Sequence, residues 1–150
     1  MALWIETSLR YDKMQENGTV RKVTEKYLFD ALTFTDAEAR TVEKLTPFIS
    51  GEFSVSATKK TKIAEIFFDE SDYADKWWLV KVNFITLDEK SGKEKKTLTQ
   101  ILVQAGDFEN ALGRFQDGMK GTVADYRIAS ISETPIMDVF KYEYKSEEKI

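Results

Sequence analysis

The sequence predicts an α+β fold in which a ββαββ unit occurs twice, and three observations lead to this prediction. First, the two halves of the 150-residue chain match each other at a spacing of 73 to 74 residues. Second, each half contains segments in which apolar and polar residues alternate, as is typical of half-buried β-strands. Third, each half has one segment with helical periodicity. We therefore expect two antiparallel sheets, each covered by one helix, because an unsupported hairpin is barely stable.

The repeat is clearest at the end of each half, where residues 53–67 align with residues 126–140 without a gap. Identical pairs in this alignment are Thr61 and Thr134, Ile63 and Ile136, and Phe67 and Phe140. Further upstream, residues 25–31 align with residues 99–105. Because aromatic residues, turn glycines and the helix recur in one order, we interpret the chain as an internal duplication.

The duplication also sets the predicted organisation of the chain. The chain divides into a first ββαββ repeat at residues 1–68, an acidic linker at residues 69–76, a second ββαββ repeat at residues 77–145 and a charged tail at residues 146–150. A repeat of this size has little core of its own, so we expect the two repeats to pack into one body.

The first repeat begins with two strands joined by a hairpin turn. Residues 4–12 alternate between apolar and polar side chains, with Trp4 and Arg10 on the less apolar face. Asn17-Gly18 predicts the turn, since these residues readily adopt positive φ. The second strand is expected at residues 20–31.

A helix and two further strands complete the first repeat. The helix is expected to begin near Thr35, which fits a capping box, although Thr33 is a rival N-cap. Its expected apolar stripe consists of Val42, Leu45 and Ile49. Pro47 ends it. The last two strands are expected at residues 52–58 and 62–68.

The second repeat follows the same plan. Its strands are expected at residues 77–86, 95–105, 124–132 and 136–144, with a turn at Lys90-Ser91-Gly92 between the first two. Its helix is expected at residues 107–119, with Phe108, Ala111, Leu112, Phe115 and Met119 as the apolar stripe. The exposed last strand would also suit pairing with another copy of the chain, so a homodimer is one of the expected assemblies.

The composition excludes several classes of function. The chain contains no Cys and no His, which excludes disulfides, thiol or imidazole catalysis and ordinary zinc sites. It contains no Gly-rich phosphate-binding motif. We therefore expect a protein that is not an enzyme and that needs neither cofactor nor metal.

Charge and hydropathy limit the partners. The net charge is −4, so the chain lacks the overall basic field that is typical of duplex-DNA binders. Residues 1–11 lack the basic region and apolar run of a signal peptide, so we expect none, and no apolar run of about 18 residues that would span a membrane occurs in the sequence. We expect a cytoplasmic protein without a membrane partner.

The two repeats share aromatic and basic residues that favour single-stranded nucleic acid as the ligand. Trp4 and Trp77 occupy matching positions in the first strands, and Arg21-Lys22 matches Lys95-Lys96 in the second strands. The full set of candidate binding residues is Trp4, Arg10, Arg21, Lys22, Lys59, Lys60, Lys62, Trp77, Lys81, Lys95 and Lys96. Bases would stack on the tryptophans while the cations hold phosphates.

An alternative interpretation needs no nucleic acid. Lysines near turns and sheet edges protect strands from aggregation, and the two tryptophans would pack the repeats together. The expected basic hairpin loop at Lys59–Lys62 is replaced by Ser132–Pro135 in the second repeat. Under this interpretation the protein is an interaction adaptor or structural module with a protein partner.

Three segments carry a resemblance to a known family: EKYLFDA at residues 25–31, TFTDAE at residues 33–38 and ISETPIMDVF at residues 131–140. Through them nearly the whole chain resembles an uncharacterised domain family, of unknown function, from gut Bacteroidetes and their tailed phages. The resemblance implies no activity and no catalytic residue. It implies a bacterial cell or an infected host cell as the location, and it favours a role in phage replication by association only.

The chain can also be divided as ββα, ββββα, ββ. The ββββα segment is loosely similar to the PC4-like and Whirly single-strand binders, whose sheets cradle nucleic acid. This fold-level similarity adds to the expectation of single-strand binding.

Overall fold

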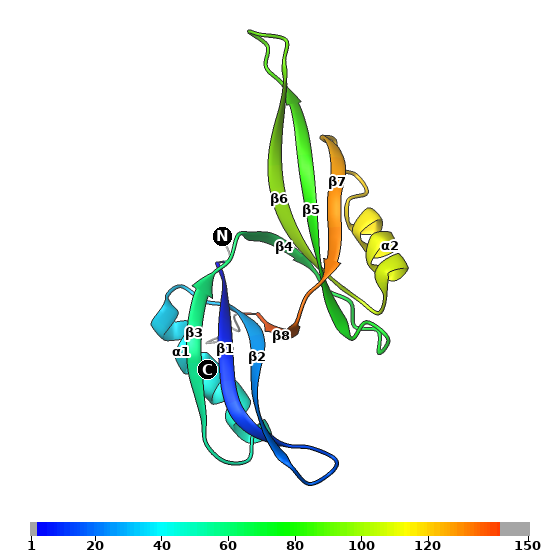
Figure 1. Cartoon of the computed structure of the whole chain (residues 1–150). Helices are drawn as coiled ribbons and strands as arrows, with labels where there is room; N and C mark the ends of the chain where they lie inside the picture. Colours follow the sequence, from blue (N-terminus) through cyan, green and yellow to red (C-terminus); the bar gives the residue numbers. More distant parts are fainter. Residues whose placement is uncertain (1–2, 142–150) are drawn as a thin grey trace, which may run out of the picture. The chain divides into compact units, whose positions relative to one another are not determined.

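The computed structural model describes residues 3–141, which form two α-helices and two four-stranded sheets (Figure 1). They divide into two compact units. The described part of unit 1 is residues 3–61 and 136–141, and unit 2 is residues 62–135. The predicted α+β class is confirmed. Among the described residues, no helix is long and apolar enough to cross a membrane.

Unit 1 is a sheet covered on one face by a helix (Figure 1). Its elements are β1 (Trp4–Met14), β2 (Val20–Asp30), α1 (Phe34–Leu45), a short 3₁₀ turn (Thr46–Phe48), β3 (Phe53–Lys60) and β8 (Ile136–Phe140). The strand order is β3-β1-β2-β8. β1 runs antiparallel to both of its neighbours, whereas β8 runs parallel to β2.

Unit 2 has the same architecture. Its elements are β4 (Ile63–Phe67), β5 (Lys76–Leu87), β6 (Glu94–Ala105), α2 (Phe108–Gly118) and β7 (Asp125–Glu133). The strand order is β4-β6-β5-β7, with β4 parallel to β6. Both units even carry their register irregularity at matching places, between Ser8 and Leu9 in β1 and between Lys81 and Val82 in β5.

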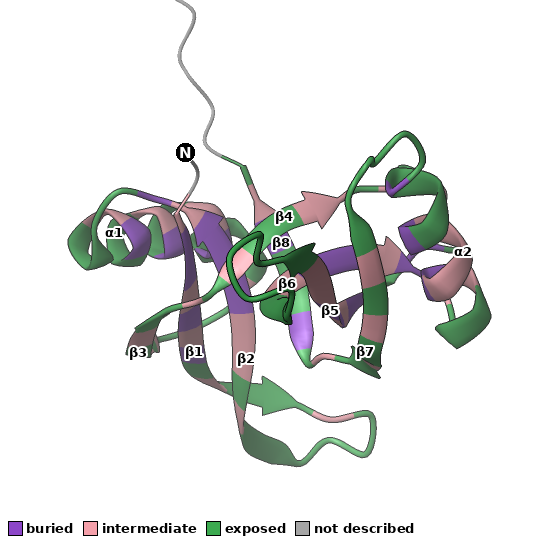
Figure 2. Ribbon diagram, turned by 90° about the horizontal axis from the view of Figure 1, so that it is seen from above, coloured by how far each residue is buried: buried purple, intermediate pink, exposed green. Residues whose placement is uncertain are grey.

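The core of each unit lies between the helix and the sheet, where Figure 2 shows the buried positions of both elements. In unit 1, Ile5, Leu9 and Phe29 of the sheet face the helix, which contributes Ala37 and Leu45. In unit 2 the corresponding layer contains Val80, Val82, Val103, Ala111 and Phe115. Removal of these side chains from water is the main stabilising contribution in each unit.

The structure shows which of the two candidate residues is the N-cap of the first helix. Thr33 is the N-cap of α1, and its Oγ1 accepts a hydrogen bond of 3.0 Å from the backbone N–H of Asp36. The expectation of a capping box at Thr35 is therefore wrong. Asp107 caps α2 in the same way, through the backbone N–H of Asn110 at 2.8 Å. Both side chains satisfy a donor that helix geometry leaves unpaired.

The apolar stripe of α1 differs from the prediction. The buried residues of this helix are Ala37, Thr41 and Leu45, while Val42 is 43% exposed. Leu45 is buried as predicted and Ile49 packs against the core, but small Ala37 and the hydroxyl of Thr41 also lie against the sheet, which hydropathy alone does not reveal. In α2, Ala111 and Phe115 are buried as expected, but Phe108 at the first turn is 51% exposed.

The predicted acidic linker at residues 69–76 is an ordered part of unit 2. The backbone N–H of Asp69 donates to Oε1 of Gln104 at 2.9 Å, and Nε2 of Gln104 donates to the carbonyl of Ala74 at 3.1 Å. Asp69 also pairs with Arg114, whose guanidinium nitrogen lies 2.6 Å from the carboxylate. Residue 76 already belongs to β5.

The compact units do not coincide with the sequence repeats. The fourth strand of the first repeat, β4, pairs with β6 of the second repeat, and β8 of the second repeat pairs with β2 of the first. Each sheet is thus completed by a strand from the other repeat. The part of the predicted last strand at residues 142–144 and the tail at residues 146–150 lie outside the described residues.

The links before the donated strands explain this exchange. Only Thr61 and Lys62 separate β3 from β4, and only Thr134 and Pro135 separate β7 from β8. A two-residue hairpin needs positive φ in its turn, but proline cannot adopt it and, among the described residues, only glycines have it. The expected hairpin loop at Lys59–Lys62 is therefore the end of β3 followed by a crossing link.

The same links are too short to bring a fourth strand to β2 of its own repeat. The position beside β2 at the far edge of the sheet lies three strand spacings from β3, or about 14 Å. The three peptide units from Lys60 to Ile63 span at most about 11 Å. A parallel placement in the same sheet would need a crossover of a dozen or more residues. The fourth strand must therefore leave its own repeat.

Candidate functional site

Each sheet has one face packed on its helix and one face without a helix, which we call the helix-free face. Because side chains alternate along a strand, the positions of Ile5 and Leu9 against α1 place Arg10 on the helix-free face. The cross-strand register then assigns the neighbouring residues of β2 and β3. The same reasoning applies to unit 2, starting from Val80 and Val82.

The helix-free face of unit 1 carries three exposed cations. Arg10 of β1 lies opposite Ser54 of β3, Lys22 of β2 lies opposite Asp12, and Lys59 of β3 lies opposite Glu6. Glu6 is already engaged, since its carboxylate lies 3.5 Å from Nζ of Lys26. In the described part of the chain, none of Arg10, Lys22 and Lys59 forms an ion pair of its own.

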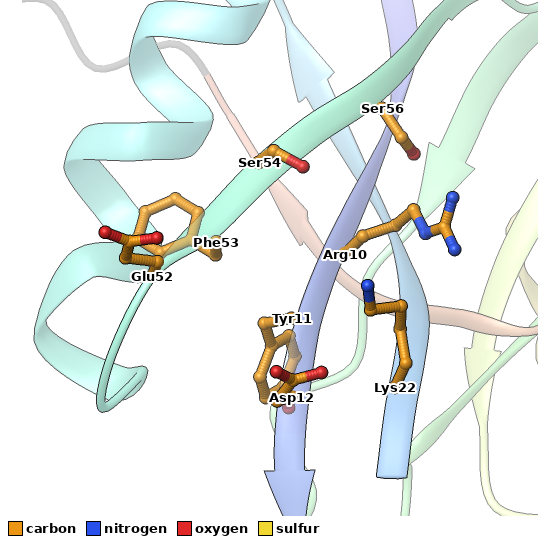
Figure 3. Close-up of a pocket in the computed structure, with 8 residues that line it drawn as sticks. All are labelled: Arg10, Tyr11, Asp12, Lys22, Glu52, Phe53, Ser54 and Ser56. Carbon is orange, nitrogen blue, oxygen red and sulfur yellow. The ribbon is translucent and has the colours of Figure 1, made fainter.

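A shallow cleft of about 390 Å³ lies at the end of the sheet that carries Arg10 and Lys22, and residues from both faces of the sheet line it (Figure 3). Its lining residues are Arg10, Tyr11, Asp12, Lys22, Glu52, Phe53, Ser54 and Ser56. Figure 3 shows the side chains of Arg10 and Lys22 next to each other, while Glu52 lies at the opposite end beside Phe53. Arg10, Lys22 and the two serine hydroxyls, from three strands, provide donors for an anionic oxygen group. Asp12 and Glu52 place two carboxylates in the same lining, with Asp12 directly opposite Lys22.

The helix-free face of unit 2 also carries cations, although only one of them is at a position that matches a cation of unit 1. Lys96, which is equivalent to Lys22, lies on this face opposite Ile85, and Lys81 lies opposite Ser130. The position of Arg10 is taken by Asn83, but its cross-strand neighbour on β7 is Arg127. The guanidinium group of unit 2 is therefore on β7 instead of β5, but it lies on the same face of the sheet. Arg127 is exposed.

Arg127 is a candidate residue that the sequence analysis did not identify. In the alignment of the repeats it matches Ser54, so comparison position by position hides it. The cross-strand register reveals it, because the pair Arg10 and Ser54 corresponds to the pair Asn83 and Arg127. Comparison of paired positions on adjacent strands would have found this signal.

The predicted basic residues divide between the two faces of the sheets. Arg21 and Lys95 precede Lys22 and Lys96 by one position and therefore point to the opposite face. Lys60 likewise lies on the face opposite to that of Lys59, across from Ile5. Lys62 lies in the link between β3 and β4, and it is exposed. A single surface thus does not include all of the predicted residues.

Both predicted stacking residues are buried. Trp4 is 6% exposed and Trp77 is 3% exposed. The ring of Trp77 makes an edge contact with Phe68, with ring centroids 5.7 Å apart. The two tryptophans lie on the helix-free faces, as their alternation predicts, but in this structure neither ring has an open face for a base.

Instead, the carbonyls of these tryptophans anchor the links to the donated strands. Thr61 donates to the carbonyl of Trp4 from its backbone N–H at 3.0 Å and from Oγ1 at 2.7 Å. Thr134 donates to the carbonyl of Trp77 in the same way, at 2.9 and 2.8 Å. The identity of the two threonines in the repeat therefore has a structural cause.

One shifted pKa belongs to a residue that lines the cleft, since burial first, and the neighbouring Glu25 second, raise the pKa of Tyr11. The other shifted pKa values belong to residues outside the cleft lining. Burial first, and the neighbouring Glu25 second, raise the pKa of Tyr27 on the helix side of β2. The backbone N–H of Ser71 lowers the pKa of Asp69 in the segment before β5, and the backbone N–H of Lys90 lowers that of Asp88 in a turn. Among the described residues, no group of three acidic side chains is placed to hold a metal ion.

Comparisons with known proteins identify a family but no activity. The model of a family described as "Domain of unknown function (DUF4494)" matches residues 3–142, so the chain belongs to this family. No curated protein matches the chain. No solved structure matches it either.

Proposed function

We propose that this member of a domain family of unknown function is a non-enzymatic protein that binds single-stranded nucleic acid through its phosphates, on the helix-free faces of its two sheets. The observation that carries the proposal is that both faces present an exposed Lys at matching positions and an exposed Arg, which lies on β1 in unit 1 and on the adjacent strand, β7, in unit 2. In unit 1 these are Arg10 and Lys22, and in unit 2 they are Arg127 and Lys96.

The chemistry of these faces supports phosphate as the group that is bound. Guanidinium and ammonium groups donate charge-assisted hydrogen bonds to phosphate oxygens. Arg10 and Lys22 line one cleft together with Ser54 and Ser56. In unit 2, Ser130 lies opposite Lys81 on the neighbouring strand. Neutral donors beside cations add contacts to phosphate without adding charge.

A single strand fits these faces better than a duplex. The net charge of −4 provides no long-range attraction to a duplex, while local cations on a sheet can follow a flexible backbone. Because Trp4 and Trp77 are buried, binding relies on phosphate contacts and is expected to be insensitive to base sequence. The setting that we propose is the cytoplasm of a bacterial or infected host cell, during replication of a phage or mobile element.

Fluorescence anisotropy with a labelled oligo-dT tests the proposal. At about 50 mM salt we expect binding that weakens steeply as salt increases, since each phosphate contact on a single strand contributes about 0.7 to the slope of log K against log salt. The double substitution Lys22→Gln and Lys96→Gln removes two contacts. It should lower the slope by about 1.4 and the affinity by about tenfold.

The chain offers a matched control for this experiment. The double substitution Arg21→Gln and Lys95→Gln removes the same charge from adjacent positions, but on the opposite faces of the same strands. We expect it to retain most of the affinity. Equal losses from both double variants would show that only net charge matters, and absence of binding by the unaltered protein at 50 mM salt would refute the proposal.

One observation favours a second candidate, a protein-interaction adaptor. Met14 and Leu87 are equivalent residues at the ends of β1 and β5, and they are 72% and 69% exposed. Exposed apolar side chains at the tips of two equivalent hairpins suit contact with a protein partner. The double substitution Met14→Ser and Leu87→Ser should abolish capture of such a partner while leaving oligo-dT binding unchanged.

A further inference from the structure

β8 connects two compact units through a very short link. The link consists of Thr134 and Pro135, after which β8 begins at Ile136. Thr134 is fixed to unit 2 through the carbonyl of Trp77, whereas β8 completes the sheet of unit 1. The strand is therefore anchored to one unit and stabilised by the other.

The ladder and the ring contact that hold β8 come from the first repeat. The strand forms a parallel ladder with β2 that includes the pairs Tyr27 with Asp138 and Leu28 with Val139. The ring of Phe140 stacks on Phe29 with centroids 4.8 Å apart. Beyond the strand, the guanidinium of Arg40 donates to the carbonyl of Lys141 at 3.0 Å. A first repeat of any copy of this chain offers the same groups.

The other donated strand, β4, is held more firmly. It is followed by the segment that Asp69 ties to Gln104 and Arg114 of unit 2. The ring of Phe67 at its end also lies against Gly118, where a Cβ atom would approach the ring to 2.5 Å. β4 is thus fixed to its unit beyond the strand as well as along it. Within residues 3–141, β4 is therefore the more firmly tied of the two donated strands.

We propose that a second copy of this chain is a binding partner and that two copies form a dimer by exchanging β8. In the dimer each unit 1 receives β8 from the other copy, and the link at Thr134–Pro135 is the hinge. No new interface is required, because the exchanged ladder has the same partners as the ladder within one chain. Exchange of an identical element between copies is a low-cost route to a dimer, and short links at the hinge favour it.

The concentration of the chain during refolding determines how much monomer and how much strand-exchanged dimer forms. Within one chain β8 meets unit 1 at an effective concentration of about the millimolar range. Chains that refold from denaturant well below this concentration therefore form monomers. The dimer fraction should increase about tenfold when the chain concentration during refolding increases tenfold, from about 0.02 to about 0.2 mM.

The absence of native Cys permits a direct test. One preparation carries Lys26→Cys and a second carries Ile136→Cys, at positions that are partners in the β2–β8 ladder. The two are mixed, unfolded, refolded at about 0.2 mM and oxidised. We expect a disulfide-linked heterodimer after refolding, and none when the folded proteins are mixed without unfolding. Light scattering before oxidation should show the dimer independently of the cross-link.

The repeat supplies the matched control. Ile63→Cys lies at the position in β4 that is equivalent to Ile136, but β4 pairs with β6 and not with β2. A mixture of the Lys26→Cys and Ile63→Cys chains should give no cross-link. The proposal is wrong if light scattering finds only monomers at every refolding concentration. It is equally wrong if a dimer forms but the two mixtures cross-link to the same extent.

Discussion

Two hydroxyls in the core of unit 1 show how single residues adapt one unit of the duplication. Thr7 and Thr41 are fully buried, and their Oγ1 atoms lie 2.9 Å apart. The Oγ1 of Thr41 also lies 2.7 Å from the carbonyl of Ala37. In unit 2 the equivalent positions hold Val80 and Phe115, which are both buried. The same site is therefore compatible with a polar pair or with apolar side chains.

Substitution of these threonines should show strong coupling. Thr41→Val leaves the hydroxyl of Thr7 without its side-chain partner, and we expect a loss of about 1–3 kcal/mol in the free energy of unfolding. The double substitution Thr7→Val and Thr41→Val should restore most of this loss, because no polar group then remains unpaired. Urea denaturation of the three variants measures the coupling, and additive losses would contradict this account.

At the residue scale, sequence patterns predicted the direction of side chains better than their surroundings. Alternation along β1 placed Trp4 and Arg10 on the same face. It did not predict that Trp4 is buried and Arg10 exposed, because periodicity carries no information about what covers each part of a face. Arg127 was missed because its counterpart, Arg10, lies on a different strand.

At the scale of elements, the helix caps illustrate the limits of local sequence rules. Thr33 and Thr35 both fit an N-cap by their sequence context, but Thr35 lies within the first turn of α1, and Thr33 has the extended backbone of an N-cap and accepts a hydrogen bond from the N–H of Asp36. The choice depends on where β2 ends and the chain turns onto the sheet. Hydropathy and spacing do not specify this point within two residues.

Alanine substitutions distinguish the two positions. Thr33→Ala removes the cap and should lower the free energy of unfolding by about 1 kcal/mol. Thr35→Ala, within the exposed first turn, should change it by less than about 0.5 kcal/mol. Thermal denaturation of both variants provides the comparison, and a larger effect at Thr35 would restore the capping box as the correct assignment.

The strands themselves were predictable, but their pairing was not. Each predicted strand overlaps an observed one, since alternation marks any half-buried strand. Alternation does not identify the neighbour, so β4 and β8 were assigned to their own repeats. The residues that indicate the exchange of strands are Thr61-Lys62 and Thr134-Pro135, because these links contain no residue suited to a hairpin turn.

At the scale of the whole molecule, the exchange makes one unit continuous and the other discontinuous in sequence. Unit 2 is the single segment 62–135, whereas unit 1 needs β8 from beyond that segment. The chain is therefore organised as one compact unit inserted into another. This differs from the organisation that the repeats alone indicate, with boundaries at residues 68 and 77.

Two fragments test this organisation. Residues 62–135 contain all strands of the unit 2 sheet, while residues 77–145 correspond to the second sequence repeat and lack β4. We expect the first fragment to show dispersed amide signals in NMR spectra and a cooperative thermal transition. The second should be less stable, because the edge of β6 and the contact of Phe67 with α2 are lost. Greater stability of the second fragment would contradict the exchange.

Lysine footprinting tests the central claim, that the helix-free faces bind single-stranded nucleic acid. Neighbouring lysines on opposite faces serve as each other's controls, namely Lys59 with Lys60 and Lys96 with Lys95. Acetylation followed by mass spectrometry, with and without oligo-dT, reports the accessibility of each amine. We predict that oligo-dT protects Lys22, Lys59 and Lys96 several-fold while Lys60 and Lys95 react as before. Equal protection within the pairs, or protection of Lys60 and Lys95 alone, would contradict the claim.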